Sequence, residues 1–166
     1  ALELMRLNEY VDVIIPRGGE GLIKTCIENS TVPVIETGVG NCHIYVDDEC
    51  DQNMALNILL NAKISRPGVC NAAEKLLVSE KIKDEFLPRA YNALKNENVI
   101  ILGCVKTKEI LPDVTLAKED DWYKEFLDYK IAFKVVSGID EAISHINKYN
   151  SKHSEAIVTS SYEKAQ

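Results

Sequence analysis

The sequence lacks the patterns typical of nucleic-acid, membrane or metal-binding proteins. Lysine and arginine number 19 against 26 aspartates and glutamates, and the net charge of −7 argues against a nucleic-acid surface. No apolar run approaches the roughly 20 residues of a membrane span. The five cysteines include no C-x-x-C pair, which indicates neither a zinc site nor a disulfide framework. We therefore expect a soluble protein of a reducing cytoplasm, without bound metal, nucleic acid or membrane.

The glycine-rich dinucleotide fingerprint G-x-G-x-x-G is also absent. What is present is ordinary for a globular chain: 166 residues, of which 46% are hydrophobic and 27% charged. Short apolar runs alternate with helical patterns along the chain. This alternation predicts an α/β fold of three layers, with a mostly parallel open sheet and helices on both faces.

The pattern also predicts where the elements lie. Helices are expected at 20–29, 51–63, 80–86, 89–96 and 105–111, with a further one opening at 137–140 and Asp51 as an N-terminal cap. The stretch 112–121 is expected to be loop. Strands are expected at 11–15, 32–36, 42–46, 75–79, 99–103, 131–136 and 155–159.

Cys70 is the strongest candidate for a reactive side chain. It follows the turn signal Pro67-Gly68 and precedes an apolar run, so a sharp bend can present its thiol at the end of a strand. Gly68 is expected to supply φ values that other residues avoid. A thiol held in this way is a candidate nucleophile. By local sequence alone, a half-buried core cysteine is the simpler interpretation, because free cysteine is among the most buried residue types.

Three motifs in order carry a resemblance to a known family. They are Val-Asp-Val-Ile-Ile-Pro-Arg-Gly-Gly at 11–19, Pro-Val-Ile-Glu-Thr-Gly-Val-Gly-Asn-Cys-His-Ile-Tyr-Val-Asp at 33–47, and Arg-Pro-Gly-Val-Cys-Asn-Ala-Ala-Glu at 66–74. Together they closely resemble the γ-glutamyl phosphate reductases, also called glutamate-5-semialdehyde dehydrogenases, of the aldehyde dehydrogenase superfamily. The resemblance covers essentially the whole chain and implies the fold of an aldehyde dehydrogenase catalytic domain.

The resemblance implies an oxidoreductase of proline biosynthesis that uses NADPH. Cys70 would attack γ-glutamyl phosphate and form a thioester, with Asn71 helping the Cys70 backbone N–H to hold the oxyanion. The product would be glutamate 5-semialdehyde. Glutamate 5-kinase is a possible partner, and the parent enzyme is expected to be a homo-oligomer in the cytoplasm.

Further site residues follow from the same resemblance. Arg17, Gly18 and Gly19 would contact the cofactor or the acyl phosphate, where a strand, a glycine turn and a helix start point N–H groups at an anion; an ordinary turn is the alternative. Glu125 would hold the nicotinamide ribose, or is a surface carboxylate. His43 would bind a substrate oxyanion, or is a half-buried histidine with satisfied hydrogen bonds.

The chain is expected to be a piece of a longer enzyme. We predict a remnant of the cofactor-binding domain at 1–37 and a truncated catalytic domain at 38–166, with negligible activity in isolation. Alternative parents are a bifunctional pyrroline-5-carboxylate synthase and another acylating aldehyde dehydrogenase. An alternative of another class is a non-catalytic α/β binding module.

Overall fold

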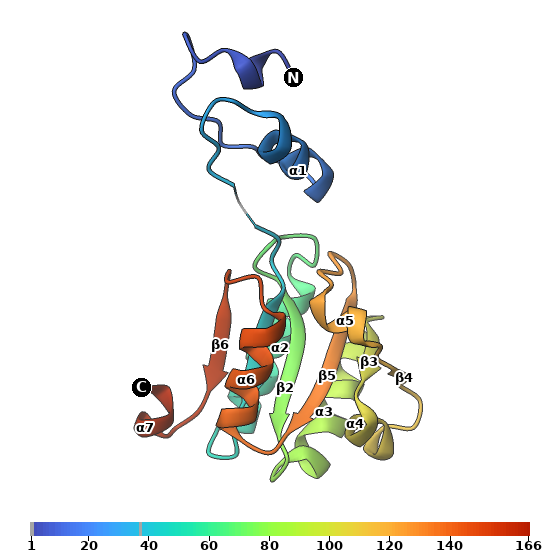
Figure 1. The fold of residues 1–166 in the computed structure, drawn as a ribbon. Coiled ribbons are helices and arrows are strands. Elements are labelled where there is room, and N and C mark those ends of the chain that lie inside the picture. The colour runs from blue at the N-terminus through green and yellow to red at the C-terminus, as the bar shows by residue number, and fades with distance from the viewer. Residues whose placement is uncertain (1, 37) are drawn as a thin grey trace. The chain divides into compact units, whose positions relative to one another are not determined.

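The computed structural model describes residues 2–36 and 38–166, which fall into two compact units (Figure 1). The first unit ends at Val39 and the second runs from Gly40 to Gln166. The predicted boundary touches residue 37, which lies outside the described residues. The assignment of the two parts to a cofactor-binding and a catalytic domain stays a prediction.

The first unit contains the short 3-10 helix η1, Leu4–Arg6, and the helix α1, Glu20–Asn29. Helix α1 was predicted, and its bounds are confirmed. The strands predicted at 11–15 and 32–36 are wrong, because these segments meet only at one isolated parallel bridge between Ile14 and Val34. Pro16 ends the first segment and Pro33 lacks a donor in the second, so neither extends into a ladder.

The second unit is built on a six-stranded sheet in the order β4-β3-β5-β2-β1-β6. Every pairing of the named strands is parallel, which confirms the predicted open parallel sheet. The strands are β1 Cys42–Val46, β2 Ala73–Ser79, β3 Ile100–Gly103, β4 Thr115–Leu116, β5 Lys130–Val136 and β6 Glu155–Val158. The short β4 and the start of α5 fall within 112–121, where only loop was predicted.

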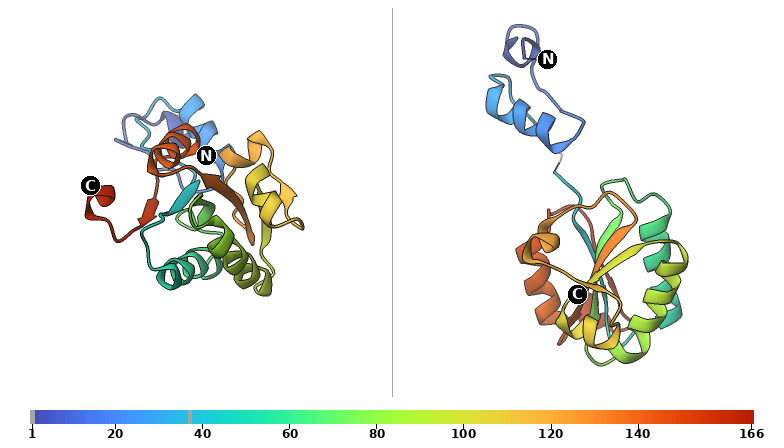
Figure 2. Two further views of the ribbon diagram at one scale, coloured as in Figure 1. Left: turned by 90° about the horizontal axis from the view of Figure 1, so that it is seen from below. Right: turned by 90° about the vertical axis from the view of Figure 1, so that its right-hand side faces the viewer.

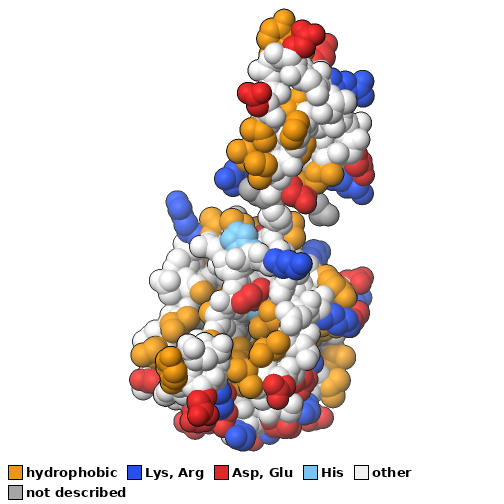
Figure 3. Space-filling model, turned by 60° about the vertical axis from the view of Figure 1, so that its left-hand side comes forward, with side chains coloured by type: hydrophobic (Ala, Val, Ile, Leu, Met, Phe, Trp, Pro, Cys, Tyr) orange, Lys and Arg blue, Asp and Glu red, His pale blue; other side chains and the backbone are white. Residues whose placement is uncertain are grey.

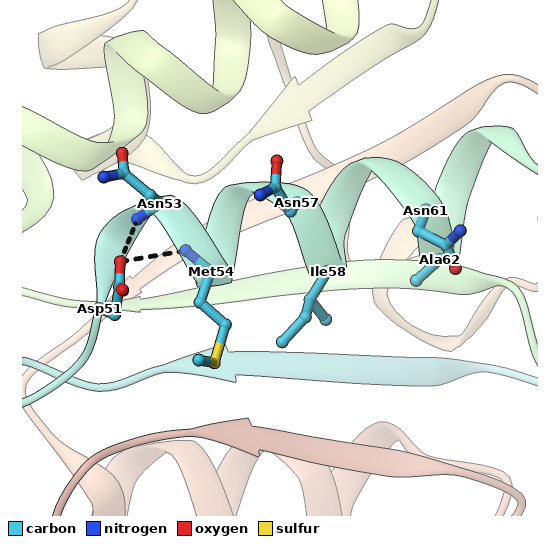
Figure 4. Close-up of a pocket in the computed structure, with 7 residues that line it drawn as sticks. All are labelled: Asp51, Asn53, Met54, Asn57, Ile58, Asn61 and Ala62. Atoms are coloured by element: carbon cyan, nitrogen blue, oxygen red, sulfur yellow. Dashed lines mark hydrogen bonds between the residues drawn. The ribbon is translucent and has the colours of Figure 1, made fainter.

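The helices of this unit are α2 Gln52–Ile64, α3 Lys83–Asn96, α4 Val105–Ile110, α5 Glu119–Tyr123, α6 Ile139–Tyr149 and α7 Tyr162–Ala165. Asp51 caps α2 as predicted, since its side chain accepts hydrogen bonds from the N–H groups of Asn53 and Met54 (Figure 4). The two helices predicted between 80 and 96 form the single helix α3, with Pro88 inside it. Buried Phe86, Leu87, Ala90 and Leu94 hold that helix together across the proline.

Helices cover both faces of the sheet, so the second unit has the predicted three layers (Figure 2). Alternate strand residues point to opposite faces. Leu76 and Val78 of β2 join the core beneath α2, α3 and α4, whereas Leu77 joins a second core beneath α6. A third cluster packs Trp122 of α5 on the α6 side of the sheet, against Ala132 of β5. Figure 3 shows side chains of both charges interspersed over one face of this unit.

Candidate active site

Cys70 lies in a turn between α2 and β2. The carbonyl of Arg66 accepts a hydrogen bond from the Val69 N–H at 3.3 Å, which closes the turn predicted at Pro67-Gly68. The carbonyl of Val69 then accepts one from the Ala72 N–H at 3.0 Å. Cys70 and Asn71 are the two central residues of this second turn, which presents both to the exterior. Gly68 does not use a positive φ, whereas Gly18 does.

Cys70 is exposed, whereas the other four cysteines are not. Cys26 and Cys42 are buried, and Cys50 and Cys104 are half-buried. The interpretation of Cys70 as a core cysteine is therefore wrong. An exposed thiol at the centre of a hydrogen-bonded turn is accessible to an electrophile, which a core thiol is not.

Segments distant in sequence converge at the amino edge of the sheet. Gly40 and Asn41 precede β1, Cys70 precedes β2, and 124–128 precede β5; β5, β2 and β1 are neighbours in the sheet. Because these strands are parallel, the segments entering them meet at one edge. A Cβ built on Gly40 would lie 1.4 Å from the carbonyl oxygen of Cys70, so only glycine permits this approach.

Two side chains hold the backbone on either side of this close contact. The Oε1 of Glu125 accepts a hydrogen bond from the Gly40 N–H at 2.7 Å. The thiol of Cys42 donates to the carbonyl of Cys70, with a sulfur–oxygen distance of 3.3 Å. Burial, together with the charge of Glu155, raises the pKa of the Cys42 thiol to about 11, so this thiol stays protonated and able to donate.

The backbone N–H groups of Cys70 and Asn71 donate no hydrogen bond to the described residues. Both residues are exposed, so these two backbone donors are free in an exposed turn. Two N–H groups next to a nucleophile are the arrangement that stabilises an oxyanion.

Lys63, which precedes the Cys70 turn in sequence, pairs with a carboxylate in the interior. Lys63 has no exposed side-chain surface, and its Nζ lies 3.4 Å from the Oε1 of the equally buried Glu74. Arg66 is exposed. The charge of Lys63 is thus directed to Glu74 in the interior.

His43 lies inside the second unit. Its ring is buried, with Nδ1 3.1 Å from the Oε2 of Glu155, and packs edge-on to His145. Neither ring nitrogen has a hydrogen-bond partner of suitable geometry among the described residues, so its hydrogen bonds are not satisfied. Its predicted contact with a substrate stays a prediction.

Arg17, Gly18 and Gly19 belong to the first unit. Gly19 is the N-cap of α1 and contributes no side chain there, as expected for a glycine turn before a helix. Gly18 has a φ of 155°, and a Cβ at this position would lie 2.8 Å from a methyl group of Leu22. The turn and helix start are thus as predicted, and the contact of these residues with a cofactor stays a prediction.

Three residues around Cys70 were not predicted as part of the site. Gly40 and Cys42 contact Cys70 directly, and Asn41 ties their segment to the carbonyls of Trp122 and Tyr149 at 2.7 and 2.8 Å. The local signal for Gly40 is the pair of glycines at 38 and 40, which does not by itself indicate a contact with Cys70. Nothing in the local sequence signals the role of Cys42.

Other features of the described residues do not compete with this site. No helix of 2–36 or 38–166 has the length and apolar character required to cross a bilayer. The same residues form no cluster of three or more metal-binding side chains. A surface groove of about 610 Å³ follows the outer face of α2 (Figure 4). It includes none of the predicted site residues, being lined by Asp51, Asn53, Met54, Asn57, Ile58, Asn61 and Ala62.

Two proteins that are similar to this chain at high identity carry the same name. The chain is 66% identical over 162 residues to the γ-glutamyl phosphate reductase of Clostridium perfringens, covering 98% of the chain and 39% of that relative. The solved γ-glutamyl phosphate reductase of Thermotoga maritima is 57% identical, with a TM-score of 0.96 over 99% of the chain and 40% of that structure. The chain thus spans about two fifths of the length of these relatives.

More distant structures share the fold. An acetylating aldehyde dehydrogenase of Geobacillus thermoglucosidasius is 21% identical, with a TM-score of 0.71 over 99% of the chain and 44% of that structure. No family model matches the chain. The sequence identity to the curated relatives is nevertheless high and extends over nearly every residue. We conclude that the chain belongs to the γ-glutamyl phosphate reductase family, within the aldehyde dehydrogenase fold.

Proposed function

We propose that this chain is the thiol-bearing part of an enzyme that reduces L-glutamate 5-phosphate to L-glutamate 5-semialdehyde and phosphate in proline biosynthesis. The observation that carries the proposal is Cys70, an exposed thiol between unpaired backbone donors, in a chain 66% identical to a γ-glutamyl phosphate reductase. The relatives extend well beyond this chain, so the activity belongs to the full-length protein.

In this proposal, the sulfur of Cys70 bonds to the acyl carbon of the substrate. The bond from that carbon to the phosphate oxygen breaks, and phosphate leaves with its electron pair. The result is a thioester on Cys70. Phosphate is a good leaving group, so this step requires little acid assistance.

The free N–H groups of Cys70 and Asn71 would stabilise the negative charge that develops on the acyl oxygen. The turn from Val69 to Ala72 already holds these two N–H groups in place. Removing one donor of this kind from an enzyme typically costs about 3–4 kcal/mol of transition-state stabilisation. The Asn71 side chain is exposed beside them and is a further candidate donor.

The residues present fit a nicotinamide cofactor at the same edge of the sheet. Glu125 uses Oε1 to bind Gly40, and among the described residues its Oε2 has no hydrogen-bond partner. A half-buried carboxylate with one free oxygen is suited to bind a ribose hydroxyl. NADPH, when bound, supplies the hydride that reduces the thioester. Within the first unit, Arg17, Gly18 and Gly19 are proposed to contact a phosphate group.

The assay in reverse tests the substrate and the nucleophile together. The full-length protein should oxidise glutamate 5-semialdehyde with NADP+ only when phosphate is present. Cys70→Ser should lower this rate by on the order of 1,000-fold or more, because the thiolate is lost. Cys50→Ser, which alters a half-buried cysteine, is the matched control and should keep the rate. A Cys70→Ser enzyme with normal turnover would remove the proposed role.

A further inference from the structure

Glu74 and Lys63 form a buried pair next to the proposed nucleophile. Lys63 lies in the last turn of α2, and Glu74 is the second residue of β2, four residues after Cys70. Both side chains are fully buried, with Nζ and Oε1 3.4 Å apart. A pair of this kind contributes little net stability compared with apolar side chains of similar size. Stability alone therefore does not account for it.

The carboxylate of Glu74 also binds two consecutive backbone N–H groups. Oε2 accepts from Phe126 at 3.1 Å and Oε1 accepts from Leu127 at 3.3 Å. Leu127 has a φ of 53°, in the left-handed region, which is unfavourable for a residue other than glycine. The carboxylate thus holds a backbone bend that the local sequence does not favour.

A neighbouring residue binds the same segment from the other face of the strand. The Nζ of Lys75 donates to the carbonyl of Lys124 at 2.8 Å and lies 4.3 Å from the ring centroid of Phe126. Successive residues of a strand point to opposite faces. Glu74 and Lys75 therefore fix residues 124–127 from both sides of β2.

Residues 124–127 are connected to Cys70 through two further contacts. It carries Glu125, whose Oε1 binds the N–H of Gly40 at 2.7 Å. Gly40 in turn lies against the carbonyl of Cys70, closely enough that a Cβ would overlap it. A displacement of residues 124–127 would therefore move Glu125, Gly40 and the turn of Cys70 together.

We propose that Glu74, buried in its pair with Lys63, is a positioning residue for Cys70. It holds residues 124–127 so that Glu125 and Gly40 keep the Cys70 turn in its reactive geometry. This inference rests on the proposed function, since it assumes that Cys70 is the nucleophile.

The two members of the pair must be tested together. Burial raises the pKa of Glu74 and lowers the pKa of Lys63, while each charge opposes the shift of the other. Removing one member leaves its partner buried without a counter-charge, which strongly destabilises the folded state. The double variant Lys63→Met/Glu74→Gln removes both charges and keeps both volumes.

The experiment measures three quantities in the full-length protein: the melting temperature, kcat and KM for the semialdehyde, and the rate of Cys70 alkylation by iodoacetamide. In the double variant, the melting temperature should stay near that of the unaltered protein. Both kcat and Cys70 alkylation should fall about tenfold or more, because a misplacement of about 1 Å can cost on the order of 100-fold. Glu80→Gln, which alters an exposed pair with Lys106, is the control and should change neither.

A double variant with unchanged kcat and unchanged Cys70 alkylation overturns the proposal, because the pair then serves the fold alone. Glu74→Asp is the second variant, for use if the double variant does not fold. It keeps the charge pair but shortens the side chain by one methylene, so that it can no longer reach both N–H groups. Reduced Cys70 alkylation in this variant supports positioning, and unchanged alkylation contradicts it.

The alkylation measurement separates this inference from the proposed function. If the unaltered protein lacks the reductase reaction but the double variant still slows Cys70 alkylation, then the proposed substrate is wrong and the positioning role stands. If the reaction occurs and neither variant alters kcat or alkylation, then only the positioning role fails.

Discussion

Gly40 is the residue on which the geometry around Cys70 depends most directly. Its missing side chain allows the segment before β1 to touch the carbonyl of Cys70, and its N–H binds Glu125. Cys42 then holds the same carbonyl with its protonated thiol. The reactive turn is therefore fixed through backbone contacts rather than through the side chain of Cys70 itself.

Gly40→Ala should separate these two segments. The added methyl would overlap the Cys70 carbonyl, so the free energy of unfolding should fall by about 1–3 kcal/mol, as for other overpacked sites. Alkylation of Cys70 by iodoacetamide should change with it, because the turn must move. Gly21→Ala is the control, since a Cβ at Gly21 meets no atom within 4 Å. Equal alkylation rates and stability in both variants would contradict the close approach.

The sequence predicted Cys70 as a site residue, but it did not predict the residues that support Cys70. The order of Pro67, Gly68 and Cys70 before an apolar run is a local signal, and the turn forms where that signal places it. The contact between Gly40 and Cys70 joins residues 30 positions apart, and it depends on how β1 and β2 pair. The local sequence around either residue does not indicate a contact between residues so far apart in the chain.

At the scale of elements, β2 is the strand that links the core to the site. All seven of its residues are buried, including Glu74 and Lys75. A parallel strand with neighbours on both sides and helices on both faces leaves no exposed position for a charged side chain. Its two charged residues therefore stay buried and bond to residues 124–127 at the amino edge of the sheet.

Lys75 makes the stability of this element depend on pH. Burial lowers the pKa of Lys75 to about 7, against an ordinary value of 10.5. Between these values the unfolded chain binds a proton that the folded chain has released. The free energy of unfolding should therefore rise with pH over this interval, by up to about 1.4 kcal/mol per pH unit from this group.

Urea unfolding at pH 7 and pH 9 measures this effect as a difference between variants. Lys75→Met should remove the contribution of Lys75, so the gain in stability between the two pH values should be smaller than in the unaltered protein. Lys24→Met replaces an exposed lysine and should keep the full gain. A gain in the Lys75→Met variant equal to that of the unaltered protein would show that Lys75 stays protonated in the fold.

The element pattern was predictable where the sheet is complete and was not where it is interrupted. Each strand predicted after residue 40 is present in the parallel sheet, because alternation of apolar runs and helices suffices to specify it. The runs at 11–15 and 32–36 have the same apolar character, but they form only a single bridge. Two short segments without a third partner do not make a stable sheet.

At the scale of the whole molecule, the proposed catalytic parts are distributed over two units. The thiol and Glu125 belong to residues 40–166, whereas Arg17, Gly18 and Gly19 belong to the first unit. The chain also spans only about two fifths of its curated relatives. Reductase activity is therefore expected of the full-length protein, and the isolated chain should show negligible turnover with NADPH.

The central claim, that Cys70 is the nucleophile, is tested most directly by competitive alkylation of the five cysteines in the full-length protein. Iodoacetamide labelling followed by peptide mass spectrometry gives a rate for each thiol. Cys70 should be modified faster than Cys26, Cys42, Cys50 and Cys104, and an acyl phosphate should protect it. Modification of Cys70 no faster than that of the half-buried Cys50 and Cys104, or without protection, would contradict the claim.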